Sequence, residues 1–286
     1  MRLTDKDYWE RVYAKNSGAP AISPPPASRR SKEWLRRLLG QSLITYSEPY
    51  DDYLLWDVIL PSYFGDAKGK SAIEIGSAPG NFMVKLADKF SVVPFGVEYT
   101  AAGTAANRLT FSEHGYNPEG VIEADVFSSD FQAAYRGKFD VVISRGFIEH
   151  FSDPKNVLDA HLSLLKQGGL LIVLIPNLRG IYWAWTWLFN RKELPLHNLD
   201  IMRINHFRTL FDPSSVDTLR CNYLGTFTFW LFTAESSALF MNKVLRGMHL
   251  VQRGINIGFR LLFGRRGCET AWFSPNLLFV GKKCKE

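Results

Sequence analysis

A short apolar strand that runs into a glycine-bearing turn constrains the fold of this chain more than any other feature. Ser71–Ile75 form the strand, Gly76–Gly80 form the turn, and a helix is expected over Phe82–Lys89. Open α/β sheets bind ligands at such a turn, where small residues let the backbone approach and the helix presents free N–H groups. The turn has neither the GK[ST] of a P-loop nor the G-x-G-x-x-G of a dinucleotide site, which argues against both classes.

Apolar segments alternate with helical segments after this turn. Strands are expected over Val92–Val97, Gly120–Glu123, Phe139–Ser144 and Leu170–Ile175, and helices over Ala101–Glu113 and Asn156–Leu165. Strands this apolar, separated by helices, predict a parallel sheet that is covered on both faces and joined by right-handed crossovers. The expected fold class is therefore α/β, with a doubly wound sheet.

The two ends of the chain are less regular. A short helix is expected over residues 4–16, a proline- and serine-rich linker over 17–31, and further helices over 32–64. In the last third we expect helices over Pro213–Leu219 and 236–263, and strands over Gly225–Phe232 and Asn276–Gly281. The expected organisation is an N-terminal arm with helices that cap the site (1–64) and one Rossmann-like domain (65–286) with insertions at 178–206 and 235–272.

The composition limits the classes of protein to which the chain can belong. Hydrophobic residues make up 46% and charged residues 22%, as in ordinary globular proteins. Cys221, Cys268 and Cys284 form no CxxC pair, so neither a metal site nor a disulfide framework is expected. The N-terminus lacks the apolar core of a secretory signal, and no apolar stretch reaches the about 18 residues of a spanning helix, so we expect a cytoplasmic protein.

The turn belongs to a longer motif that has a known counterpart. The segment E-I-G-S-A-P-G resembles the first motif of class I S-adenosylmethionine-dependent methyltransferases, usually written E/D-x-G-x-G-x-G, with alanine in place of the central glycine. Further motifs follow in that family's order over residues 70–180. The resemblance implies a seven-stranded, mostly parallel sheet with an antiparallel last strand, and S-adenosyl-L-methionine as cofactor. It also implies that the cofactor is held by Glu74, Gly76, Ser77, Ala78, Pro79 and Gly80.

The same resemblance assigns residues to the adenosine part of the cofactor. Glu98 ends the second strand, where a carboxylate can accept hydrogen bonds from two ribose hydroxyls. Tyr99 and Thr100 would flank the adenine, Asp125 would bind its amino group, and Val126 would pack on the ring. The alternatives are that Glu74 and Glu98 are surface acids at strand ends, and that Asp125 is a helix N-cap.

Residues after the fourth strand are expected near the reacting end of the cofactor. By resemblance, Ser144 and Arg145 line its methionine end. Methyl transfer to a hydroxyl needs aligned reactants and removal of a proton, for which histidine is a suitable base near neutral pH. The candidates are His150, after the fourth strand, and His206, ahead of the sixth, each against the alternative of a structural histidine.

Positive charge is concentrated in the last third of the chain. Residues 181–286 hold 14 Lys and Arg against 7 Asp and Glu, and Lys243–Arg266 hold six basic residues and no acidic one. Together with the tryptophan-rich segment 181–189, this composition is typical of a peripheral contact with a membrane, here the inner membrane surface, through 181–189 and 243–266. The alternative is an insertion that packs on the domain or forms a homo-oligomer interface.

Three functions fit these observations. The leading one is methylation of an oxygen atom of a small-molecule or glycan acceptor, including a lipid-linked one. An RNA ribose methyltransferase is suggested by the Ser77–Gly80 sequence and the basic tail, but that family needs an aspartate where Ser144-Arg145-Gly146 stand, so nucleic acid is not the expected partner. The third is a non-catalytic methyltransferase-like adaptor at a membrane or protein surface.

Overall fold

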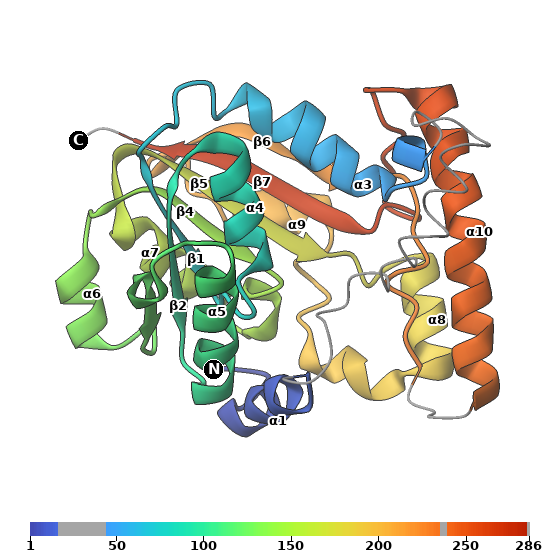
Figure 1. The fold of residues 1–286 in the computed structure, drawn as a ribbon, viewed down its shortest axis with the longest axis horizontal. Helices are drawn as coiled ribbons and strands as arrows, with labels where there is room; N and C mark the ends of the chain where they lie inside the picture. Colours follow the sequence, from blue (N-terminus) through green and yellow to red (C-terminus); the bar gives the residue numbers. More distant parts are fainter. Residues whose placement is uncertain (17–43, 235–238, 285–286) are drawn as a thin grey trace.

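Seven strands form one sheet in the computed structural model, which describes residues 1–16, 44–234 and 239–284 (Figure 1). The strands are β1 Ser71–Ile75, β2 Val93–Glu98, β3 Val121–Glu123, β4 Phe139–Arg145, β5 Leu165–Pro176, β6 Val216–Leu224 and β7 Asn276–Lys283. Their order is β3-β2-β1-β4-β5-β7-β6, with β1 to β5 parallel and β7 antiparallel to both of its neighbours. The α/β class and the antiparallel last strand are therefore confirmed.

Successive side chains of the central strands point to opposite faces of the sheet, which divides the hydrophobic core into two layers. In β4, Val141 and Ile143 face one layer and Val142 faces the other. Burying each such side chain contributes about 1.5–3 kcal/mol, so both faces of the sheet need a cover of helices. Helices α3 (Tyr50–Tyr53), α4 (Asn81–Phe90) and α5 (Ala101–Glu113) contribute to the first layer, and α6 (Ser129–Tyr135), α7 (Pro154–Leu164) and α9 (Ile204–Thr209) to the second.

The N-terminal helix α1 (Lys6–Asn16) packs against α5, well away in sequence. Asp5 Oδ1 accepts a hydrogen bond of 2.6 Å from the backbone N–H of Tyr8 and so caps the start of α1. Helix α3 continues through a π-helical turn at Leu54–Ile59 and ends in a 3-10 turn at Leu60–Ser62. The linker at 17–31 and the helix expected directly after it lie outside the described residues.

Two expectations for the last third are wrong. Strand β6 begins inside the expected helix Pro213–Leu219 and ends before the expected strand Gly225–Phe232. Pairing along the apolar strand β7 overrides the weak preference of the polar residues in β6. Gly225, at φ +86°, then turns the chain out of the sheet, and aromatic residues beyond it pack around Tyr182 instead of forming a strand.

Two helices stand at the end of the molecule opposite α6: α8 (Ile181–Phe189) and α10 (Leu239–Phe263) (Figure 1). Both pack on the segment that follows β6. Trp185 of α8 stacks on Phe232 with ring centroids 4.4 Å apart, and His249 of α10 stacks on Trp230 at 4.0 Å. Among the described residues, no helix is both long and apolar enough to cross a membrane.

Candidate active site

The turn after β1 has a backbone that only glycine accommodates at two positions. Gly76 has φ +69°, and a side chain there would meet the ring of Phe147. Gly80 has φ +97°, and a side chain there would collide with Asn107. Asn107 in turn donates a hydrogen bond of 2.5 Å to Ser77 Oγ. The turn, in which the Ala78–Pro79 bond is cis, is thus held against α5.

The carboxyl group of Glu74 lies buried directly before this turn. Its Oε1 atom is 3.8 Å from Arg145 Nε, and its Oε2 atom has no hydrogen-bond partner among the described residues. Burial raises the pKa of Glu74 to about 7, although Arg145 opposes the shift. A buried carboxyl oxygen without a partner, beside a glycine turn, suits a ligand that brings an ammonium group. The methionine end of S-adenosylmethionine carries such a group.

Glu98 ends β2 and lines the same site. Its Oε1 atom accepts hydrogen bonds from the backbone N–H of Thr100 at 2.9 Å and from Thr100 Oγ1 at 2.7 Å. Burial raises the pKa of Glu98, and the bonds from Thr100 oppose that rise. Thr100 also caps the start of α5, since its Oγ1 accepts from Gly103 N. Glu98 is therefore not a solvated strand-end acid but a buried carboxylate held in one orientation.

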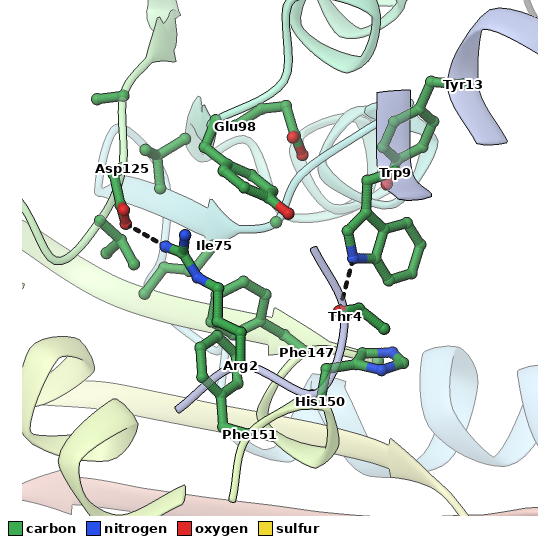
Figure 2. A pocket seen from close by; sticks show the side chains of 16 residues that line it. Arg2, Thr4, Trp9, Tyr13, Ile75, Glu98, Asp125, Phe147, His150 and Phe151 are labelled. Atoms are coloured by element: carbon green, nitrogen blue, oxygen red, sulfur yellow. Dashed lines mark hydrogen bonds and ion pairs between the residues drawn. The ribbon is translucent and has the colours of Figure 1, made fainter. Parts of the chain in front are cut away.

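Asp125 is engaged by a residue that the sequence did not point to. Its Oδ1 atom lies 2.6 Å from Arg2 Nη2 (Figure 2). The same atom accepts a hydrogen bond from the backbone N–H of Phe127. The guanidinium of Arg2 lies 4.8 Å from the ring centroid of Tyr99 and 5.5 Å from that of Phe127. Helix α6 is capped by Ser128, so Asp125 is not its cap. A planar cation stacked on aromatic rings and bound to a carboxylate occupies the surroundings expected for the adenine.

The N-terminal segment forms one wall of a first cavity that Glu98 and Asp125 also line, whereas Glu74 lies outside its lining (Figure 2). Trp9 Nε1 donates to Thr4 Oγ1 at 3.0 Å, and its ring lies edge-on to His150 at 5.2 Å. Tyr13 is part-buried near Glu98, and loss of solvent around its hydroxyl raises its pKa. The first cavity is lined by Arg2, Thr4, Trp9, Tyr13, Ile75, Gly76, Val97, Glu98, Tyr99, Ala124, Asp125, Val126, Gly146, Phe147, His150 and Phe151.

A second cavity of about 590 Å³ opens on the other side of the end of β4. Arg145 and Gly146 line it, and Gly146 lines the first cavity as well. Arg145 lies over the ring of Phe82 at 4.9 Å, which fixes its guanidinium in this wall. Ser144, one residue earlier, is buried, and its Oγ atom has no hydrogen-bond partner among the described residues.

The walls of the second cavity combine aromatic and charged side chains. Trp56, Phe82 and Trp230 give it apolar surfaces. Asp51 also lines it, and burial together with the neighbouring Asp52 raises the pKa of Asp51 to about 6. Sequence reasoning missed Asp51, although the acidic pair in the first turn of the helix that follows Pro49 was an available signal. A volume of this size accommodates a small organic molecule.

The two candidate histidines lie in different surroundings. His150 lines the first cavity; its Nδ1 is 2.8 Å from the carbonyl of Leu196 and its ring is 4.6 Å from that of His197. Burial, followed by the nearby His197, lowers the pKa of His150 to about 4, so the ring is uncharged at neutral pH. His206, on α9, is half exposed, its Nδ1 lies 2.7 Å from Asp200 Oδ2, and it lines neither cavity.

One more buried carboxyl group, that of Glu149, lies next to the first cavity. Glu149, next to His150, is buried, and burial raises its pKa to about 8. Its Oε1 atom would lie 3.5 Å from a Cβ built on Gly146. In the described part of the chain, no three His, Cys, Asp or Glu side chains are grouped as metal ligands.

The sequence was compared with protein families and with curated proteins. A family model described as a methyltransferase domain matches residues 51–219. The chain is 30% identical over 101 residues to a ubiquinone biosynthesis O-methyltransferase of Thiobacillus denitrificans, a match that covers 35% of this chain and 42% of that protein. It is 28% identical over 121 residues to a tRNA U34 carboxymethyltransferase of Desulfotalea psychrophila, covering 42% and 37% of the two chains. The matched segments thus span less than half the length of these curated relatives.

A solved structure is similar over nearly the whole chain. The geranyl diphosphate C-methyltransferase of Streptomyces coelicolor A3(2), in complex with Mg2+, geranyl diphosphate and S-adenosyl-L-homocysteine, superposes with a TM-score of 0.55. The alignment covers 97% of this chain and 98% of that one at 12% identity, which shows a shared fold. With the family model matched over more than half of its residues, the chain belongs to the methyltransferase domain family of S-adenosylmethionine-dependent enzymes.

Proposed function

We propose that this protein transfers the methyl group of S-adenosylmethionine to an oxygen atom of a small-molecule or glycan acceptor, including a lipid-linked one. The observation that carries the proposal is the position of Gly146, which lines both cavities, with Arg145 beside it in the wall of the second cavity. A transfer reaction needs two adjoining sites, one for the donor and one for the acceptor.

The first cavity suits the donor, which supplies a methyl group activated by a sulfonium. Glu98 would hold the ribose hydroxyls and Asp125 the adenine amino group, with Tyr99 and Val126 on either side of the ring. The turn Gly76–Gly80 would admit the rest of the cofactor, and Glu74 would pair with its ammonium group. Ser144 offers a buried hydroxyl near the methionine end.

The second cavity would hold the acceptor, with aromatic walls for a ring and charged groups for its polar substituents. Removal of the acceptor proton would fall to a side chain that is unprotonated at neutral pH and accepts the proton as the methyl group is transferred. Of the two histidines expected from the sequence, we assign this role to His150, because His206 lines neither cavity. Asp51, which lines the second cavity itself, is the other candidate base.

Calorimetry with S-adenosylhomocysteine tests the donor half of the proposal. The wild-type protein is expected to bind it, and Glu98→Gln should weaken binding by about 10- to 100-fold, because a charge-assisted hydrogen bond contributes about 1.5–3 kcal/mol. Glu123→Gln is the matched control, since Glu123 is paired with Glu98 in the sheet register but is exposed. A wild-type protein that does not bind the ligand would overturn the proposal.

Turnover with isotope-labelled S-adenosylmethionine tests the acceptor half. The panel consists of phenols, sugar nucleotides, lipid-linked glycans and a tRNA transcript. We expect labelled methyl ether on one of the first three classes, and loss of turnover in Asp51→Asn with S-adenosylhomocysteine binding intact. In His150→Ala, which changes the wall of the first cavity, turnover should fall by a larger factor than the affinity for S-adenosylhomocysteine. Labelling of the tRNA alone would contradict the small-molecule assignment and favour the activity class of the tRNA-modifying relative.

A further inference from the structure

The outer face of α8 is apolar although it is exposed to solvent. Trp183 and Trp187, one helical turn apart, are 44% and 43% exposed, and their rings stack at a centroid distance of 6.2 Å. Leu188 beside them is 63% exposed, whereas Tyr182 and Thr186 on the inner face are buried. A surface helix of a globular domain ordinarily turns polar side chains outward. An outer face of this kind marks a contact surface.

Helix α10 also exposes apolar side chains on its outer face and buries polar side chains on its inner face. Its inner face carries buried polar side chains in addition to Phe259 and Phe263: Gln252 accepts a hydrogen bond from Phe229 N at 2.9 Å and donates to Asn256 Oδ1 at 2.8 Å. Asn256 in turn donates to the carbonyl of Ser47 at 3.1 Å. These buried hydrogen bonds fix the rotation of the helix about its axis. The opposite face, with Leu250 at 68% exposure, is consequently held outward.

The outer face of α10 can approach a flat surface closely. Gly247, Gly254 and Gly258 have open space where a side chain would stand, so no side chain there keeps a partner at a distance. Leu261 and Leu262, further along the helix, are also exposed. Positive charge accompanies the apolar residues. The segment Lys243–Arg266 has no acidic side chain, and four of its six basic residues are exposed: Lys243, Arg246, Arg265 and Arg266.

A third exposed element connects to α8. Trp272 and Phe273 are both exposed, and the carbonyl of Trp272 accepts a hydrogen bond of 3.2 Å from the backbone N–H of Ile181, at the start of α8. The two residues therefore add exposed aromatic surface beside the first turn of α8. Helices α8 and α10 stand at the same end of the molecule (Figure 1). We call the outer faces of α8 and α10, with Trp272 and Phe273, the docking surface.

We propose that the docking surface binds peripherally to a bilayer that contains anionic phospholipids. Tryptophan is favoured at the boundary between headgroups and acyl chains, where its ring is apolar and its N–H is wet. Each basic side chain near an anionic membrane contributes about 1 kcal/mol. A second copy of the chain is the less favourable occupant, because it would bring the basic side chains of two α10 helices together.

The docking surface adjoins the second cavity, a relation whose meaning rests on the proposed function. Trp230 lines the second cavity, and its ring also stacks on that of His249 of α10, with the ring centroids 4.0 Å apart. One layer of side chains thus lies between α10 and the second cavity. A lipid-linked acceptor held in the bilayer would therefore need to pass only this layer of side chains to reach the second cavity.

Co-sedimentation with vesicles tests the proposal without any cofactor or acceptor. The probes are vesicles of phosphatidylcholine alone and of phosphatidylcholine mixed with phosphatidylglycerol at about 7:3. We expect binding to the mixed vesicles and at least about tenfold weaker binding to the neutral ones. Trp183→Ser with Trp187→Ser, and separately Arg246→Glu with Arg265→Glu, should each lower the affinity for mixed vesicles by about tenfold or more.

The controls are exposed residues on helices away from the docking surface. Leu109→Ser removes an equally exposed apolar side chain from α5, and Lys155→Glu reverses a charge on α7; both should bind vesicles as the wild type does. Equal binding to both vesicle types, or no binding together with a dimer in sedimentation velocity, would overturn the proposal. S-adenosylhomocysteine affinity, measured on every variant, reports the fold and the donor site, so a failure of the proposed function is seen separately.

Discussion

Buried carboxyl groups set the chemistry at the scale of single residues. Glu74 and Glu149 both have pKa values raised by burial, while Glu98 is held by Thr100 and Asp125 by Arg2. Charged groups are costly to bury without partners, and such groups gather where a ligand is bound. The sequence pointed to three of these acids because each stands at a strand end in a motif. It gave no sign of Arg2, because the contact joins residues far apart in the chain.

The raised pKa of Glu149 predicts how stability depends on pH. The folded protein keeps a proton on this group up to about pH 8, whereas the unfolded chain releases it near the ordinary value of 4.5. The free energy of unfolding should therefore fall as the pH rises from 4.5 toward 8 and stay low above it. Glu149→Gln removes this loss, so we expect it to be more stable than the wild type by about 3 kcal/mol near pH 9.

Urea denaturation followed by circular dichroism at several pH values checks this expectation. The two proteins should have similar stability at about pH 4, where the wild-type carboxyl group is protonated in both states. Glu113→Gln, at the exposed end of α5, is the control and should show the pH dependence of the wild type. If the free energy of unfolding of Glu149→Gln differed from that of the wild type by the same amount at every pH, a raised pKa at Glu149 would be contradicted.

At the scale of elements, α1 is attached to the rest of the domain through the N-terminus of α5. Glu10 accepts hydrogen bonds from the backbone N–H groups of Ala101 and Ala102 at 2.8 and 3.0 Å, in the first turn of α5. These bonds lower the pKa of Glu10, and the positive end of the α5 dipole favours its charge. Since α1 also supplies Trp9 and Tyr13 to the first cavity, this contact holds one wall of the donor site in place.

Glu10→Gln should loosen that wall and speed the release of the cofactor product. We expect the dissociation rate of S-adenosylhomocysteine to rise by about threefold to tenfold, because a neutral amide interacts more weakly with the helix terminus. Stopped-flow fluorescence of the protein measures the rate. Asp7→Asn changes an exposed carboxylate on the same helix and should leave the rate unchanged. Identical rates in both variants would show that α1 does not control release.

The elements themselves were predictable to the extent that local pattern determined them. Helix α5 has the bounds expected from the sequence, Ala101–Glu113, and the apolar strands β1, β2 and β4 lie within one residue of theirs. Strand β6 was missed because its residues look polar and helical, and only pairing with β7 makes them a strand. The walls of both cavities could not be predicted, since they bring α1, α3 and the segment after β6 together by tertiary packing.

At the scale of the whole molecule, the sheet separates tasks by position. The donor groups stand where β1, β2 and β4 end, the second cavity lies beyond β4 and β5, and α8 with α10 closes the far end (Figure 1). Residues from the first 16 line the first cavity, and residues between 224 and 276 line the second. The net charge of +6 follows the same division, because its excess lies in the last third.

The contact between Arg2 and Asp125 has a consequence for ionic strength. The pair is part exposed, so added salt should weaken it and free the carboxylate for the adenine amino group. We expect the affinity for S-adenosylhomocysteine to rise with potassium chloride, and Arg2→Ala to bind tightly at every concentration. Attraction to anionic vesicles should fall over the same range. One salt titration, read by calorimetry and by sedimentation, would then show the two ends of the molecule responding in opposite directions.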